Sequence, residues 1–508
     1  MKFSNHITHP YRKHIPFLFL GALIIRVYFG RYNIIIEGDS VSYLSSAKDF
    51  VNFHFMGNQP YFCLYSIVIG LGNIAVHDFE KAGQFTSIAA SSLTIVPLYF
   101  LSYRIFNASI AVLACILFIF EPTLIDCATK IGTESLYHLF VVTAFTTLIY
   151  GMQSTKARYL FFAGLFSGCA YATRTEGLLY GISIIFLAIT IILLKENPQY
   201  SLSFNSINRI FYIACGFITI ALAFQTVYFF YTGELSILRK SSLAFQMANH
   251  INTHRLIRYF ENAFYLFTRQ IPVVLPYPIM IIAGIGLFRK VWDKKDFIKY
   301  TYTFAAIFTP LLTLPLVLSV TRHITVILPF FLILVSVGII EISEWLVSSI
   351  NKLQYIRRII VITGITVLLL IIMSIMKMDV WVGMIKDDET EFKIAGQFIK
   401  NHTTWQKPKV FGNGIVSYYA EAENVDIPFK ILLSDGRTQT GYSTKEILNY
   451  IKEKDTDYLI ISERCLFLEQ FRYLVTSTIF PDNFNLVFAK NDYPSIRVFK
   501  LDSSLHSE

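Results

Sequence analysis

The chain has 508 residues, of which 54% are hydrophobic and only 16% are charged. Soluble domains carry about 25% charged residues, so this composition excludes an ordinary soluble protein and predicts a membrane protein. The formal net charge is +9, but the Lys and Arg residues lie mostly between apolar runs. That placement is typical of membrane topology rather than of nucleic-acid binding, and no nucleic-acid partner is expected.

Eleven apolar segments are predicted to cross the membrane. A helix of about 20 residues covers the roughly 30 Å hydrocarbon core. The predicted spans are residues 15–32, 82–103, 108–126, 134–152, 158–175, 177–194, 209–230, 271–288, 299–320, 323–345 and 357–377. The Gly-rich apolar stretch 60–76 is interpreted as a re-entrant or interfacial element, because the topology is consistent only if it does not cross.

The positions of the basic residues agree with this count. With the N-terminus in the cytoplasm, they concentrate in the short loops that the positive-inside rule weighs most. These are Lys2, Arg12, Lys13, Arg104, Lys156, Arg158, Lys195, Arg209, Arg289, Lys290, Lys294, Lys295, Lys352, Arg357 and Arg358. The odd number of spans then places residues 37–39 and everything after Lys377 outside. The sequence therefore predicts a multi-pass protein of the cell inner (cytoplasmic) membrane with an extracytoplasmic active site and C-terminal domain.

After Asp379 the composition becomes that of a soluble domain. Residues 389–401 and 443–454 have helical periodicity, 409–411 and 457–462 are strand-like, and 484–489 with 495–501 are expected to pair as a hairpin. Alternating helices and strands indicate a small α/β domain. We therefore expect a transmembrane catalytic domain over 1–378 and a periplasmic α/β domain over 379–508.

The first outer segment, Ile36 to Ala47, contains the carboxylates Glu37 and Asp39. Asp39 followed by Ser40 predicts a helix start, with Asp39 at the N-cap and an amphipathic helix over 40–53. A carboxylate there faces free N–H groups and the positive end of the helix dipole, which keep it ionised. Asp39 could then accept a proton from an incoming hydroxyl, or it could only cap its helix.

Further ionisable side chains fall in three other outer turns, at the expected membrane level of Asp39. They are Lys130 and Glu134, Arg174 and Glu176, and Arg322 and His323. Charges at the edge of a membrane are functional candidates by default. Arg174 and Glu176 could instead only neutralise one another. Three separate turns with charges at one face predict a cavity there.

Such a cavity suits transfer from a phosphate-linked donor. A lipid phosphate leaves readily when Arg or Lys stabilises its charge, so one carboxylate that activates the acceptor hydroxyl suffices. Direct displacement would invert the anomeric carbon. The basic outer segment 231–270 either contacts a phosphate or forms an amphipathic surface helix. The sequence has no P-loop, HExxH or GxSxG motif, so ATP hydrolysis, zinc proteolysis and serine esterase chemistry lack support.

The order of these pieces resembles the GT-C glycosyltransferases that use polyprenyl-phosphate sugars. The chain is similar to bacterial relatives of the protein O-mannosyltransferases, to the lipid A aminoarabinose transferase and to galacturonic acid transferases of the lipopolysaccharide core. The matching pieces are Gly38-Asp39 with Tyr43 and Ala47, 80–84 (EKAGQ), Glu121-Pro122, 134–137 (ESLY), 174–178 (RTEGL), and Arg322-His323 ahead of Leu328-Pro329. Their order and topology together carry the resemblance, since no single motif is specific.

The resemblance implies roles for individual residues. Asp39 is expected to be the catalytic base and Glu134 the second acidic residue of the site. Substrate binding is expected from Glu37, Tyr43, Lys130, Arg174, Glu176, Arg322 and His323, with Arg322 near the donor phosphate. The chain departs from the relatives in two places: Gln59-Pro60 stands where the aminoarabinose transferase has a lysine-proline pair, and Ser40 stands where some relatives carry a second acid. The resemblance implies no certain cofactor, and it leaves open whether a divalent metal takes part.

The predicted function is an integral membrane glycosyltransferase. It would transfer a monosaccharide from a polyprenyl-phosphate donor to a lipid-linked or cell-surface glycan, such as lipopolysaccharide, in contact with membrane lipids. The alternatives are a protein O-mannosyltransferase, a transporter or flippase for lipid-linked sugars, and an inactive homologue that acts as a binding scaffold. A transporter would place polar residues near mid-bilayer and show repeated halves. Charges clustered at one face, without a visible repeat, favour the enzyme.

Overall fold

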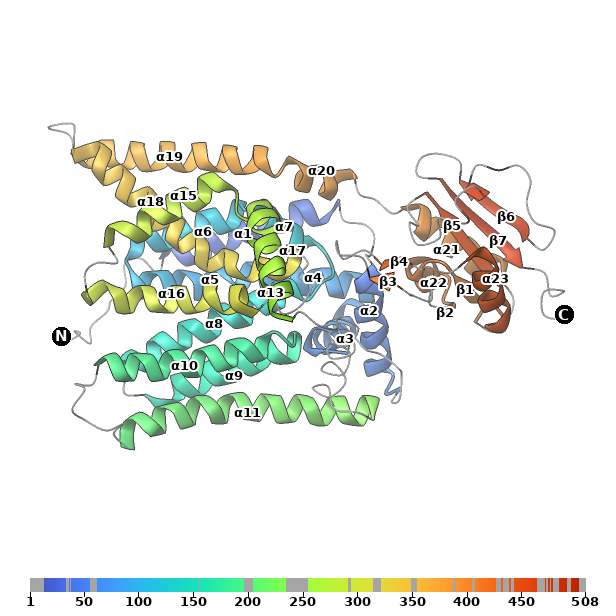
Figure 1. The fold of residues 1–508 in the computed structure, drawn as a ribbon, viewed down its shortest axis with the longest axis horizontal. Helices are drawn as coiled ribbons and strands as arrows, with labels where there is room; N and C mark the ends of the chain where they lie inside the picture. The colour runs from blue at the N-terminus through green and yellow to red at the C-terminus, as the bar shows by residue number, and fades with distance from the viewer. Residues whose placement is uncertain are drawn as a thin grey trace. The chain divides into compact units, whose positions relative to one another are not determined.

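The structure is a computed structural model (Figure 1). It describes residues 13–32, 36, 38–54, 62–154, 156–195, 204–233, 255–290, 294–313, 321–348, 354–386, 390–403, 407–425, 431–432, 438–439, 443–463, 471, 474–475, 477, 484–490 and 495–501. The chain divides into two compact units: a helical unit (1–33 with 42–386) and a sheet unit (34–41 with 387–508). This division falls later than the expected boundary after residue 378 and assigns 34–41 to the sheet unit.

Helices form the first unit because its long apolar runs satisfy their backbone groups internally and start at capping side chains. Asp78 caps α4 by accepting from the Lys81 N–H at 3.1 Å, and Asn107 caps α6 by accepting from Ile110 at 3.0 Å. The helices are α1 (His14–Gly30), α2 (Gly38–Val51), α3 (Leu64–Val76), α4 (Phe79–Leu93), α5 (Ile95–Ile105), α6 (Ala108–Phe120), α7 (Pro122–Thr129), α8 (Glu134–Gln153), α9 (Ala157–Thr173), α10 (Gly177–Lys195), α11 (Phe204–Thr232), α13 (Arg255–Tyr265), the π-helix η2 (Leu266–Gln270), α14 (Ile271–Val274), α15 (Tyr277–Lys290), α16 (Lys294–Thr313), α17 (Thr321–Ile324), the 3₁₀-helix η4 (Thr325–Ile327), α18 (Leu328–Ser348), α19 (Gln354–Met376) and α20 (Met378–Lys386).

Every one of the eleven predicted spans overlaps an observed helix. Within the described residues, five helices are long and apolar enough to cross a membrane, or seven when each sharply bent pair counts as one span. Three further apolar helices are shorter. The polytopic helical fold is thus confirmed, whereas the count of eleven spans stays a prediction. The 13 residues of α3 reach only about 20 Å, less than the hydrocarbon core, and Figure 1 shows α3 nearly end-on among helices that run across the view.

Two sharp bends shape the helical unit. The axes of α6 and α7 meet at 60°, where Glu121 is extended and Pro122 begins the next helix. Residues 260–274 lie at 98° to α15. The prediction of one straight span over 271–288 is wrong, because this second bend lies between α14 and α15. The straight segment begins only at Tyr277.

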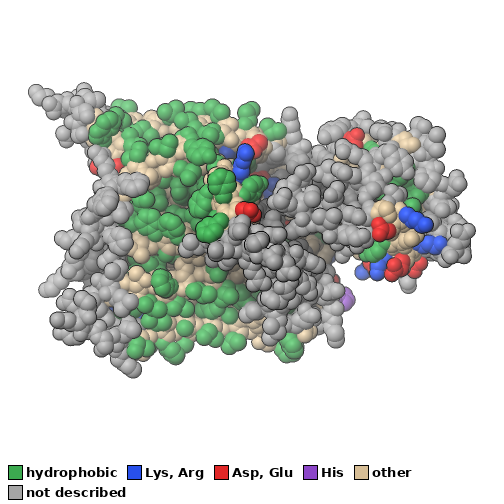
Figure 2. Space-filling view, viewed as in Figure 1, with side chains coloured by type: hydrophobic (Ala, Val, Ile, Leu, Met, Phe, Trp, Pro, Cys, Tyr) green, Lys and Arg blue, Asp and Glu red, His purple; other side chains and the backbone are tan. Residues whose placement is uncertain are grey.

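The surface of the helical unit is apolar (Figure 2). Large hydrophobic side chains are exposed along α11 and α19, and only 17% of the most apolar window of either helix is buried. A soluble protein would not expose apolar patches of this extent. The chain is a multi-pass membrane protein.

Small residues let α9 and α11 approach closely. A Cβ atom on Gly164 would lie 1.9 Å from the Ile213 carbonyl oxygen, and one on Gly216 would lie 2.0 Å from that of Phe161. Neither position can carry a side chain unless the helices separate. Such small-residue contacts are typical of helix pairs inside membranes.

The sheet unit contains a five-stranded sheet in the order β2-β1-β5-β7-β6. Its strands are β1 (Lys409–Phe411), β2 (Glu423–Val425), β5 (Tyr458–Ser462), β6 (Phe484–Lys490) and β7 (Ile496–Leu501). β1 is parallel to β2 and β5, and β7 is antiparallel to β5 and β6. β3 (Ile431–Leu432) and β4 (Thr438–Gln439) form a separate antiparallel pair. The helices are α21 (Thr390–His402), α22 (Gly414–Tyr419) and α23 (Thr444–Glu453).

The predicted elements of this unit are confirmed. The continuous apolar run of β5 is buried at all five positions, as expected for a central strand, and the predicted hairpin is the β6–β7 pair. The helix predicted over 443–454 begins with a capping box between Ser443 and Glu446. Sequence analysis did not find α22 or β2, which are short and follow the Gly and Asn residues of the turn after β1.

Candidate active site

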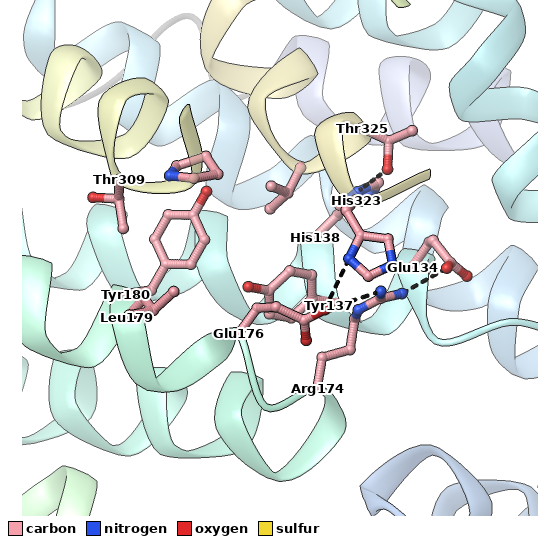
Figure 3. A pocket seen from close by; sticks show the side chains of 12 residues that line it. Glu134, Tyr137, His138, Arg174, Glu176, Leu179, Tyr180, Thr309, His323 and Thr325 are labelled. Carbon is pink, nitrogen blue, oxygen red and sulfur yellow. Dashed lines mark hydrogen bonds and ion pairs between the residues drawn. The ribbon is translucent and has the colours of Figure 1, made fainter. Parts of the chain in front are cut away.

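Three turns of the helical unit bring four ionisable side chains together (Figure 3). Glu134 is the first residue of α8, Arg174 and Glu176 form the turn between α9 and α10, and His323 lies on α17. The Arg174 guanidinium contacts Glu134 Oε1 at 2.6 Å and Glu176 Oε1 at 3.4 Å. His323 Nδ1 lies 3.0 Å from the same Glu176 oxygen. We call these four residues the charged cluster.

Electrostatics favours the ionised forms of Arg174 and Glu176. Burial by itself would raise the pKa of Glu176, but Arg174 and the hydrogen bond from His323 hold that pKa well below its ordinary value. Burial would also lower the pKa of Arg174, and the carboxylates of Glu176 and Glu134 more than offset this and raise it. The Arg174–Glu176 pairing that the sequence left open does occur. It is part of a larger network, because Arg174 also donates to Thr133 Oγ1 at 3.1 Å.

The charged cluster forms one side of a pocket whose empty space, counted together with the open solvent at its mouth, is about 400 Å³. The remaining lining residues come from α8, α10, α16 and the η4 segment, and several are aromatic or apolar. They are Tyr137, His138, Leu179, Tyr180, Thr309, Pro310, Thr325 and Val326. A cavity that combines an apolar wall with a few convergent polar groups is the usual form of a small-molecule site.

The wall opposite the cluster is held in place by hydrogen bonds. Pro310 lies inside α16 and has no N–H, so it cannot bond to the carbonyl of Ala306 four residues earlier. The Tyr180 hydroxyl donates to that carbonyl at 3.1 Å instead. On the other side, His138 Nε2 lies 3.1 Å from Thr325 Oγ1, which ties α8 to η4.

This arrangement can bind a hydroxyl-rich ring. Carboxylates and an imidazole at one side can accept or donate hydrogen bonds, and aromatic side chains at the other can cover an apolar face. The guanidinium of Arg174 is already shared between two carboxylates. It orients the cluster rather than offering an uncompensated positive charge.

Asp39 lies in the first turn of α2 rather than at its N-cap, because the helix begins at Gly38, two residues before the predicted start at Ser40. The predicted capping role is therefore wrong in detail, although a carboxylate in the first turn still faces the positive end of the helix dipole. Tyr43 lies one turn further along α2, and its ring meets that of Tyr65 edge-on at 5.6 Å. Glu37 lies outside the described residues.

Two other predicted site residues are not placed in the cavity. Lys130 pairs with Asp126 at 3.1 Å, one turn back, and does not line the cavity. The backbone of Arg322 belongs to α17, next to His323, but its side chain lies outside the described part of the structure. Gln59 and Pro60, and residues 234–254 of the basic outer segment, lie outside it as well.

Sequence reasoning missed several lining residues that a helical pattern could have indicated. Tyr137 and His138 follow Glu134 by three and four residues, so they share one face of α8. Tyr180 stands in the same relation to Glu176 on α10. Nothing in the sequence indicated Pro310 or Thr325, because each reaches the cavity only through tertiary packing.

A second ion pair, between Lys377 and Glu121, lies apart from the cavity and is fully buried, with side-chain exposures of 1% and 0%. The Lys377 ammonium also donates to Thr123 Oγ1 at 2.8 Å and to the Val274 carbonyl at 2.7 Å. Glu121 Oε2 accepts from the Leu124 N–H at 2.7 Å. This one ammonium therefore joins both sharp bends of the helical unit to the break between α19 and α20.

No metal site is evident in the part of the chain that the structure describes: no three His, Cys, Asp or Glu side chains come together to hold an ion.

Comparison with known proteins supports the sequence-based expectation. Residues 60–207 match the family model described as dolichyl-phosphate-mannose-protein mannosyltransferase. A comparison with curated proteins finds no match.

Two solved structures share the fold. ArnT from Cupriavidus metallidurans, bound to undecaprenyl phosphate, superposes with a TM-score of 0.59 at 12% identity, covering 97% of this chain and 99% of that one. The Archaeoglobus fulgidus oligosaccharyltransferase in its apo form gives 0.58 at 11% identity, covering 91% and 70%. The predicted fold class, a polytopic helical membrane unit followed by a C-terminal α/β domain, is the fold of these two structures. The matching family and both structural neighbours are glycosyltransferases.

Proposed function

We propose that this chain is an integral membrane glycosyltransferase that moves a monosaccharide from a polyprenyl-phosphate donor to a lipid-linked or cell-surface glycan. The observation that carries the proposal is the charged cluster at the cavity, in a helical unit with the GT-C fold. Burying two carboxylates, a guanidinium and an imidazole beside an apolar wall is costly. Such a cost is typical of a site that must bind and orient a polar substrate.

Two structural neighbours bind lipids of the same chemical class. ArnT was solved with undecaprenyl phosphate, and the archaeal oligosaccharyltransferase AglB was solved with dolichol phosphate and an inhibitory peptide. Both lipids are polyprenyl phosphates. We infer the same class of donor for this chain, with the reaction on the outer face of the cytoplasmic membrane, where the predicted topology puts Asp39.

The reaction we propose is a direct inverting displacement. The Asp39 carboxylate accepts the proton of the acceptor hydroxyl as its oxygen attacks the anomeric carbon. The bond between that carbon and the phosphate oxygen breaks, and the polyprenyl phosphate leaves with the electron pair. Glu134 contributes through its ion pair with Arg174 by holding the cluster in one geometry. By resemblance, Arg322 stabilises the charge of the leaving phosphate.

The family-model match favours a second candidate, transfer to a protein hydroxyl, because that family is described as a protein mannosyltransferase. The donor side of the reaction would be the same. Mass spectrometry of lipopolysaccharide, surface glycans, secreted proteins and lipid-linked sugars in a deletion strain separates the two acceptors. A strain that lacks neither a glycan nor a protein modification, and accumulates no lipid-linked sugar, would contradict both.

Asp39→Asn tests the proposed base. Asn keeps the size of the side chain but cannot accept the proton, so transfer should fall by about 10²–10⁴-fold. Loss of the charge at the helix N-terminus costs only about 0.3–1 kcal/mol, so the protein should still fold. The assay is transfer from undecaprenyl-phosphate sugars by purified protein with confirmed monodispersity and thermal stability.

Asp49→Asn is the matched control, because Asp49 is on the same helix and the chemical change is identical. It should retain most of the activity. Near-normal transfer by a well-folded Asp39→Asn protein would return Asp39 to a structural role in the first turn of α2.

A further inference from the structure

The hydroxyl of Tyr137 is an unpaired polar group at the cavity. The side chain is 4% exposed, and its hydroxyl has no hydrogen-bond partner among the described residues. The ring itself is firmly held: it meets the Tyr180 ring edge-on at 6.1 Å, and the Arg174 guanidinium lies 5.8 Å from its centroid. In Figure 3 the hydroxyl points toward the Tyr180 side of the cavity. A rigid ring therefore presents a donor that nothing in the described chain uses.

The other polar side chains that line the cavity all have partners. Those of the charged cluster bond to one another, and His138 and Thr325 are paired. Thr309 Oγ1 donates to the Ala305 carbonyl at 2.6 Å and contacts Ser183 Oγ at 2.7 Å. Tyr180, chemically identical to Tyr137, has the Ala306 carbonyl as its acceptor. Because buried hydroxyls are normally paired, the exception at Tyr137 indicates a bound group.

The surroundings of Tyr137 indicate which chemistry that group has. Among the described lining residues, the two carboxylates outnumber the single guanidinium, and the imidazole faces one of these carboxylates. A phosphate placed here would meet no surplus positive charge. A neutral hydroxyl next to an apolar ring face fits better, because Leu179, Tyr180 and Pro310 supply apolar surface in the same cavity.

We propose that this cavity holds the transferred sugar ring and that the Tyr137 hydroxyl hydrogen-bonds one particular hydroxyl of that sugar. Tyr137 is then a specificity-determining residue, and the donor phosphate lies outside the aromatic part of the cavity. The inference rests on the proposed function and deepens it by naming the group that selects the sugar.

Tyr137→Phe is the direct test, because it keeps both ring contacts and removes only the hydroxyl. Transfer is measured with undecaprenyl phosphate carrying glucose, mannose or a 4-amino pentose. It is then measured with monodeoxy analogues of the donor that the wild type uses best. For the wild-type protein, kcat/KM with one of the deoxy donors should be about 10–100-fold lower than with the complete donor. For Tyr137→Phe, kcat/KM with the complete donor should be lower than in wild type by the same factor. The variant should use the complete donor and that deoxy analogue equally well.

Thermal stability supplies an independent readout. Removal of an unpaired hydroxyl should leave the melting temperature of substrate-free Tyr137→Phe unchanged or raised. The matched control is Tyr180→Phe, the same change in the same cavity. It should lower the melting temperature, because the Ala306 carbonyl loses its donor, and it should leave the selectivity among deoxy donors as in wild type.

The outcomes separate the two proposals. If wild type transfers no sugar from any of these donors, the proposed function fails. If wild type is active and Tyr137→Phe matches it with every donor, the proposed role of Tyr137 fails and a water molecule is the partner of the hydroxyl. A clear loss of stability in substrate-free Tyr137→Phe would also overturn the inference, because the hydroxyl would then have a partner in the protein.

Discussion

Lys377→Met should destabilise the helical unit strongly, because it removes one partner of a fully buried ion pair. Methionine replaces most of the apolar stem of lysine but leaves the Glu121 carboxylate, the Thr123 hydroxyl and the Val274 carbonyl without their donor. Breaking a buried pair in this way costs about 3–5 kcal/mol, most of it the penalty of an uncompensated buried charge. Native domains are stable by only about 5–15 kcal/mol, so the effect is large.

The assay is thermal unfolding of purified protein in detergent, followed by intrinsic fluorescence, together with the half-life of the folded state at a fixed temperature. The matched control is Lys400→Met. It removes the same side chain from a pair with Glu421 at 2.8 Å whose side chains are 50% and 66% exposed. Exposed pairs contribute about 0–1 kcal/mol, so this control should behave like wild type.

The double variant Lys377→Met with Glu121→Gln tests why Lys377→Met loses stability. If the penalty comes from the unpaired charge, a neutral residue at 121 should recover much of the lost stability, because replacing both partners of a buried pair is often close to neutral. The reasoning is refuted if Lys377→Met unfolds like Lys400→Met, or if the double variant is no more stable than Lys377→Met alone.

Two further predictions concern the charged cluster and the topology. The pKa of Glu176 is held below its ordinary value of 4.5, so its contribution to stability is complete above about pH 5 and is lost as the pH falls through the lowered pKa. The stability difference between wild type and Glu176→Gln should therefore shrink as the pH falls below about 5; a difference that grows with acidity would contradict this. Reporter fusions after Lys156, Lys295 and Lys352 should report a cytoplasmic location. Fusions near Asp39, Gln246 and Leu501 should report an external location. A cytoplasmic signal at Leu501 would require an even number of spans and contradict the topology.

Much of the fold follows from local sequence patterns. Apolar runs of about 20 residues can satisfy their backbone groups in a membrane only as helices, so each predicted span overlaps a helix. In the sheet unit, the mostly apolar run 458–462 predicts a buried strand, and it forms the central strand β5, which is buried at all five positions. The lengths of the spans also predict that charges from separate turns lie at one level, and Glu134, Arg174, Glu176 and His323 do come together.

Only the tertiary structure decides which of these charges meet. Arg174 could be expected to pair with Glu176, two residues away, but its shortest contact is with Glu134 on α8, and Glu176 also bonds to His323. Lys377 and Glu121 lie 256 residues apart, and they meet because α7 turns away from α6 at Glu121. Periodicity reports the face that a residue occupies on its own helix, whereas a partner is fixed by bends and packing between helices. The unpaired hydroxyl of Tyr137 can be recognised only in the tertiary structure, because only there is it clear that no described neighbour bonds to it.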